Sequence, residues 1–111
     1  MENIQRVAGY CRINCDSEEN KVLYKLQCNH LRNMINSNPN MTLVDIYGDY
    51  DVPGTSKNKP EFERMMKDCC DGKIDVVITK DLSRISRNIC DSLDALEQFK
   101  KYGVKLMLEI G

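Results

Sequence analysis

Apolar residues in this chain follow two kinds of pattern, which alternate from one end to the other. Short, nearly continuous apolar runs rich in β-branched residues are typical of buried strands, and longer stretches with an apolar residue every third or fourth position are typical of helices. Strand-like runs cover residues 4–13, 43–47, 74–79 and 104–108, and helix-like stretches cover residues 17–37, 60–72 and 89–101. This order predicts an α/β fold in three layers, with a mostly parallel four-stranded sheet and helices on both faces.

The first predicted helix has a clear start and a broad apolar stripe. Ser17 is a suitable N-cap, and Glu18 and Glu19 suit the first turn. Apolar residues then recur at helical spacing, and we expect this whole set to face the sheet. The set comprises Val22, Leu23, Leu26, His30, Leu31, Met34 and Ile35.

The segment from Gly48 to Lys59 predicts a long loop. It has no apolar periodicity and contains the turn formers Pro53 and Gly54, so we expect it to be the most mobile internal segment. Pro60 follows it and suits the first turn of the second helix. The buried stripe predicted for that helix is Phe62, Met65, Met66 and Cys69.

Two arginines follow the third predicted strand directly. Arg84 and Arg87 are three residues apart, which places both guanidinium groups on one face of a helical turn. Ligands of open α/β sheets bind at the carboxyl ends of the strands, and two planar charged forks suit one phosphate group. A solvated pair of surface arginines is the alternative; the strand-end position favours phosphate binding.

The first strand carries polar residues toward the same edge. Tyr10 and Arg12 are two residues apart and therefore share a strand face, which Asn14 continues. We expect Arg12, Asn14, Arg84 and Arg87 to converge closely enough to share one phosphate. A buried ion pair with Asp49 is the alternative for Arg12, and simple packing is the alternative for Tyr10.

Three separated motifs resemble one protein family. Tyr10-Cys11-Arg12-Ile13-Asn14 is similar to the opening Tyr-x-Arg-Val-Ser of the serine site-specific recombinases, the resolvase and invertase family. Gly54-Thr55-Ser56 resembles that family's central loop, and Ser83 to Asn88 resembles its Ser-Arg-x-x-Arg-Asn loop. The motifs occur in the family's order from about Val7 to Ile110, with the character of the large serine recombinases of mobile elements. The resemblance implies a flavodoxin-like catalytic domain.

The resemblance also implies roles for particular residues. Members of this family cut DNA by transesterification, in which a serine attacks a phosphate and arginines rather than a metal stabilise the transition state; no cofactor is needed. The residues that match the family's catalytic positions are Tyr10, Arg12, Asn14, Ser83, Arg84 and Arg87. Those that match DNA- or phosphate-binding positions are Gln27, Asp49, Lys59 and Asn88.

One departure concerns the nucleophile. Asn14 stands where the family has its serine, and an amide cannot form the phosphodiester-linked intermediate. Lys59 also stands where an arginine is common. Three readings stay open: a recombinase catalytic domain whose activity is in question, a decayed core that acts as a protein-interaction module, and a phospho-receiver domain. The last needs an acidic pair after the first strand, and only Asp16 is present.

Composition limits the partners. The 111 residues suit one domain, and the net charge of −1 is low for a chain that grips DNA alone. We therefore expect a catalytic domain that is cut short before a long dimerisation helix and a DNA-binding region. Dimers or tetramers are expected for the full-length protein. With no long apolar run and no signal peptide, we expect no membrane contact and a cytoplasmic location.

Six cysteines raise the question of a metal or disulfide site. They are Cys11, Cys15, Cys28, Cys69, Cys70 and Cys90. No Cys-x-x-Cys pair occurs, and the single histidine, His30, has no partner at zinc-finger spacing. We expect reduced thiols that pack as small apolar residues.

Overall fold

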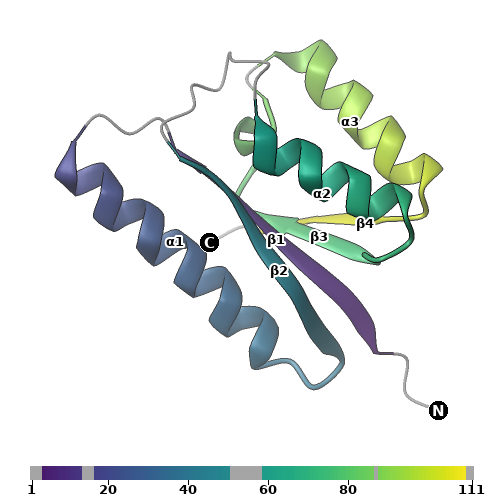
Figure 1. Cartoon of the computed structure of the whole chain (residues 1–111), viewed down its shortest axis with the longest axis horizontal. Coiled ribbons are helices and arrows are strands. Elements are labelled where there is room, and N and C mark those ends of the chain that lie inside the picture. Colours follow the sequence, from purple (N-terminus) through teal and green to yellow (C-terminus); the bar gives the residue numbers. More distant parts are fainter. Residues whose placement is uncertain (1–3, 14–16, 51–58, 87, 110–111) are drawn as a thin grey trace.

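The computed structural model describes residues 4–13, 17–50, 59–86 and 88–109 (Figure 1). Strands and helices alternate along these residues, as the apolar pattern predicts. The elements are β1 (Gln5–Ile13), α1 (Glu18–Asn36), β2 (Met41–Tyr50), α2 (Pro60–Cys70), β3 (Val76–Thr79), the 3₁₀ turn η1 (Leu82–Arg84), α3 (Ile89–Lys101) and β4 (Lys105–Leu108). None of the helices among these residues is long and apolar enough to cross a membrane.

The four strands form one parallel sheet in the order β2-β1-β3-β4. Helix α1 covers one face of this sheet, and α2 and α3 cover the other (Figure 1). The predicted three-layer α/β fold is therefore confirmed. Because all four strands run the same way, their carboxyl ends gather at one edge of the sheet, where polar side chains from different elements can meet.

Strand β1 is the centre of two hydrophobic cores. Its side chains alternate between the faces of the sheet, so that Ala8 and Tyr10 belong to the core under α2 and α3, whereas Val7 and Cys11 belong to the core under α1. All of them are buried completely. The same alternation places Arg12 on the side of α2 and α3.

The apolar stripe predicted for α1 is wrong in its amino-terminal half. Val22, Leu23 and Leu26 are 57%, 54% and 58% exposed, and only Leu31 and Ile35 of the set are fully buried. Among the rest, Met34 is partly buried and packs on the core, whereas His30 is exposed.

The residues that pack inward instead are Tyr24 and Cys28, which continue the line of Leu31 and Ile35 along the helix. Tyr24 lies over Gly48, where a Cβ would come within 1.7 Å of the Tyr24 hydroxyl. The inward positions are thus taken by Tyr24, which has a polar hydroxyl, and by Cys28, which is small. A prediction from hydrophobicity places Leu23 and Leu26 inward instead, because leucine is more hydrophobic than either residue.

The second strand is longer than the prediction. Residues 48–50, which we expected to open the loop, complete β2 and pair with the end of β1. Gly48 carries no side chain, and this leaves the space that Tyr24 fills. The rest of the predicted loop, residues 51–58, lies outside the described residues.

Candidate active site

Predicted site residues from β1, β2 and the turn after β3 lie together at the carboxyl edge of the sheet. Arg12 is next to the end of β1 and is paired with Asp49 in the parallel register of β1 and β2. The turn η1, which carries Arg84, follows β3, and β3 is the other neighbour of β1. The parallel topology thus brings together residues that are far apart in the sequence.

Arg12 is buried against the backbone of the arginine loop, a name we use for residues 83–88. Its side chain is 2% exposed. Its Nε donates a hydrogen bond of 2.8 Å to the carbonyl oxygen of Arg84, and its Nη2 donates one of 2.5 Å to the carbonyl oxygen of Ser83. Arg12 therefore contacts Arg84 through the backbone carbonyl group of Arg84 and not through its side chain.

Asp49 joins Tyr10 to the start of α2. The Tyr10 hydroxyl donates to Asp49 Oδ2 over 2.6 Å, and the backbone amides of Glu61 and Phe62 donate to the same carboxylate over 3.0 Å each. Asp49 thus caps a helix that has no side-chain cap of its own, and its charge suits the helix N-terminus. Burial and the hydrogen bond to Asp49 raise the pKa of Tyr10 far above its usual value, so the phenol stays protonated.

Lys59 has a different partner from the phosphate that we expected. Its side chain is buried, and its Nζ donates to the backbone carbonyl oxygen of Ile85. Burial and the nearby charge of Arg12 lower the pKa of Lys59. In this structure Lys59 therefore holds the backbone of the arginine loop at Ile85.

The Arg84 side chain lies on the opposite side of the sheet from Arg12. It lines a cavity of about 290 Å³ next to α1, together with Ile13, Leu23, Leu26, Gln27, His30, Lys80 and Glu109. Arg84 Nε and Gln27 Oε1 are buried there and have no hydrogen-bond partner among the described residues. At the rim, His30 Nε2 lies 2.7 Å from Glu109 Oε1. The cavity thus holds an unused donor and an unused acceptor.

The other predicted residues of the loop stabilise its ends. The Ser83 hydroxyl donates to Asp81, and the side chain of Asn88 accepts from the amides of Cys90 and Asp91 as the N-cap of α3. Burial alone would raise the pKa of Asp81, but the hydrogen bond from Ser83 and the charge of Arg84 outweigh it and lower the pKa. The expectation that Arg12 and Arg84 share one phosphate is wrong, because the Arg12 guanidinium is buried against two carbonyl groups whereas the Arg84 side chain lines the cavity next to α1. Asn14 and Arg87 lie outside the described residues, so their part in the site remains a prediction.

Sequence reasoning missed Ser92. This residue is buried on α3, and its hydroxyl donates to the carbonyl oxygen of Ser86 over 3.1 Å. A polar residue on the inward face of a helix is the signal that could have identified it, because Ala95 and Phe99 follow at helical spacing and are buried. The described residues include no group of three His, Cys, Asp or Glu side chains able to hold a metal ion.

Comparisons with known proteins agree with the motifs. The family described as "Resolvase, N terminal domain" matches residues 7–109, and the chain belongs to this family. A search of curated proteins found no match.

Solved structures show the same fold in several recombinases. The catalytic domain of ISC1926 TnpA, an IS607-like serine recombinase, is 23% identical, with a TM-score of 0.83 over 96% of this chain and 68% of that chain. The N-terminal catalytic domain of TP901-1 integrase is 21% identical, with a TM-score of 0.83 over 95% of this chain and 78% of that chain. A resolvase-family site-specific recombinase from Streptococcus pneumoniae is 28% identical, with a TM-score of 0.78 over 94% and 71%.

Proposed function

We propose that this chain is the catalytic domain of a site-specific DNA recombinase and that its arginine loop binds a DNA phosphodiester. The observation that carries the proposal is the Arg84 Nε–H group, which is buried in a cavity at the carboxyl edge of a parallel sheet and has no hydrogen-bond partner among the residues that the structure describes. A buried donor on a charged group is costly unless a ligand accepts from it, and a phosphate oxygen is a suitable acceptor.

Nearby groups suit such a ligand. Lys80 adds a second cation at the cavity, and Gln27 presents a side-chain amide that can both donate and accept. Leucines of α1 form its apolar wall. We further propose that Arg87 joins Arg84 on the phosphate, as the family motif implies, so that two guanidinium groups neutralise the charge that develops in the transition state.

The reaction class we propose is the family's transesterification on DNA. A serine oxygen attacks phosphorus, the 3′ oxygen leaves, and the 5′ end becomes linked to the protein until the 3′ hydroxyl attacks in turn and reseals the strand. At position 14 this chain has an amide, which lacks the required nucleophile. We therefore propose that the chain binds the phosphodiester without forming the covalent intermediate.

Phosphate binding is tested on the chain itself by titration with dimethyl phosphate, a minimal phosphodiester. The nuclear magnetic resonance signal of Arg84 Nε–H should shift and saturate, and Arg84→Gln should abolish the saturable binding. Arg64→Gln is the matched control, because Arg64 is an exposed arginine that already pairs with Glu61 and Asp45. Equal loss of binding in both variants would contradict a specific site.

Covalent chemistry is tested by restoring the nucleophile. Asn14→Ser, in a fusion with a DNA-binding region and a dimerising helix, should give a denaturation-resistant protein–DNA band that survives a chelator. Adding Arg84→Ala should weaken the band about a hundredfold or more, since one charge-stabilising contact contributes that much in rate. An adduct from the Asn14 protein would overturn the assignment of position 14.

A second candidate function is a non-catalytic interaction module that pairs with an active relative. The exposed apolar residues Val22, Leu23 and Leu26 on α1 favour it, because three such residues on one helix form a surface able to contact a protein. Sedimentation of the chain alone should show a monomer or a weak dimer at micromolar concentration. Heterodimers with an intact recombinase that are lost in Leu23→Ser would support the module, and recovery of activity in Asn14→Ser would support the enzyme.

A further inference from the structure

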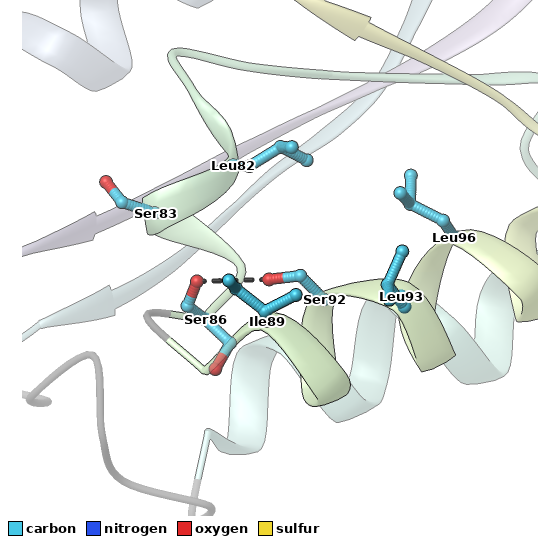
Figure 2. Close-up of a pocket in the computed structure, with 7 residues that line it drawn as sticks. All are labelled: Leu82, Ser83, Ser86, Ile89, Ser92, Leu93 and Leu96. Carbon is cyan, nitrogen blue, oxygen red and sulfur yellow. Dashed lines mark hydrogen bonds between the residues drawn. The ribbon is translucent and has the colours of Figure 1, made fainter.

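The carbonyl groups of four consecutive residues in the arginine loop each accept a hydrogen bond from a side chain of another element. Ser83 and Arg84 accept from Arg12 of β1, and Ile85 accepts from Lys59, which directly precedes α2. Ser86 accepts from Ser92 of α3 over 3.1 Å (Figure 2). Three separate parts of the fold thus hold one short stretch of backbone.

This arrangement is buried throughout. Arg12, Lys59 and Ser92 are 2%, 6% and 7% exposed, and the Ile85 side chain belongs to the hydrophobic core. The interaction between carbonyl dipoles and two buried cations is strongly favourable where water is excluded. A buried donor left without its acceptor would destabilise the fold, so movement of the carbonyl groups is disfavoured. These contacts therefore favour the observed backbone position of residues 83–86.

The Arg84 side chain depends on this support. Its Nε makes no hydrogen bond within the described part of the chain, so that atom does not anchor the side chain. The side chain starts from the backbone of η1, a turn of only three residues that cannot hold its own shape as a longer helix would. The position of this turn therefore bears on where the Arg84 side chain can point.

We infer that Lys59 and Ser92 are positioning residues, which aim Arg84 at the bound phosphate by holding the carbonyl groups of Ile85 and Ser86. Neither residue is among those that line the Arg84 cavity: Lys59 binds the carbonyl group of Ile85, and Ser92 of α3 binds that of Ser86. This inference rests on the proposed function for the identity of the ligand. The backbone support itself can be tested without it.

The first test measures amide hydrogen exchange in the whole chain. Ser92→Ala removes the hydroxyl that holds Ser86, and exchange of the Arg84, Ile85 and Ser86 amides should become about three- to tenfold faster relative to the global rate, which corresponds to one lost hydrogen bond. Ser92→Thr keeps the hydroxyl and should restore the slow exchange.

Thr79→Val is the matched control. The Thr79 hydroxyl is also buried and donates to a backbone carbonyl, but the acceptor is Tyr10 of β1, at 3.0 Å, and not a residue of the loop. This variant should lower the overall stability of the fold without a selective effect on residues 84–86. Equal exchange of those amides in Ser92→Ala and Thr79→Val, each relative to its global rate, would overturn the inference.

The second test measures dimethyl phosphate binding through the Arg84 Nε–H signal. Ser92→Ala and Lys59→Met should each weaken binding about three- to tenfold, whereas Ser92→Thr and Thr79→Val should stay within twofold of the unaltered chain. If the unaltered chain binds no phosphate, the proposed function fails, and the exchange result still decides the support of the loop. If it binds and Ser92→Ala binds equally well, the positioning role is wrong.

Discussion

Arg6 and Arg12 lie near the two ends of the same strand, β1, and they serve different purposes. The Arg6 side chain is 49% exposed and pairs with the Asp75 carboxylate, with Nη2 2.9 Å from Oδ1. The Arg12 side chain is 2% exposed and donates to two backbone carbonyl groups of the arginine loop. An exposed pair is screened by water and contributes little to stability, whereas a buried cation that holds backbone determines where a loop lies.

The same contrast separates two aspartates. Asp75 accepts from the backbone and the side chain of Arg6 at the exposed amino end of the sheet. Asp49 is buried at the carboxyl end, where it accepts from Tyr10 and from the first amides of α2. The amino end of β1 is thus held by a local ion pair. The carboxyl end is held by a network that reaches α2 and the arginine loop.

The largest expected effect is that of Arg12→Met. Two charged hydrogen bonds to buried carbonyl groups are lost, and we expect a loss of about 3 kcal/mol in the free energy of unfolding. Arg6→Met is the control at the other end of the strand and should leave the urea midpoint nearly unchanged. Comparable losses in the two variants would remove the distinction between the ends.

Asp49→Asn should have the next largest effect. The amide keeps one acceptor for the amides of α2 but loses the charge at the helix N-terminus and weakens the bond from Tyr10, so we expect a loss of about 1–2 kcal/mol in the free energy of unfolding. Urea denaturation measures it, and Asp75→Asn is the matched control. A greater loss in Asp75→Asn would contradict the picture of a tightly held carboxyl end.

Arg12→Lys should destabilise the fold less than Arg12→Met, which removes the charge. A lysine keeps the cation but presents one ammonium group, which cannot reach both carbonyl groups in the geometry of the guanidinium fork. We expect about 1 kcal/mol of destabilisation by urea, from one lost hydrogen bond. Exchange of the Ser86 amide should also become faster. A variant as stable as the unaltered chain would show that charge alone holds the loop.

The smallest expected effect is a pH dependence confined to the amino end. The hydrogen bonds from Arg6 lower the pKa of Asp75, so the pair stabilises the fold above the unfolded pKa, near 4, and this contribution is lost as the pH falls through the lower folded value. The small difference between the unaltered chain and Arg6→Met should therefore disappear at acidic pH. The difference for Arg12→Met should persist, because backbone carbonyl groups do not titrate.

Several features of the fold were predictable because they depend on neighbours in the sequence. Ser17 caps α1, Pro60 begins α2, and the alternation of strand and helix implies parallel strands with shared carboxyl ends. The position of Arg12 and Arg84 at that edge follows from the same pattern. The caps depend on a few adjacent residues, and the alternation of strand and helix depends on the spacing of apolar residues along the chain.

The rotation of α1 was not predictable in the same way. Leucines outrank Tyr24 and Cys28 on hydrophobicity, but the inward face is the one that fits over Gly48 and the side chains of β1. The hydrogen-bond partner of Lys59 was not predictable either. The motif spacing indicates a positive charge near the phosphate site, but it does not indicate which acceptor the ammonium group binds. Both outcomes depend on surfaces that exist only after several elements have packed.

The sequence by itself determined the fold class, the family and the edge of the sheet where the site lies, because periodicity and ordered motifs are properties of the chain. Only the tertiary structure decided that Arg84 faces α1 while Arg12 and Lys59 hold its loop from the other side. Long flexible side chains can reach many acceptors. Which one they bind is decided by the positions of β1, α2 and the loop relative to one another, and no spacing in the sequence encodes that arrangement.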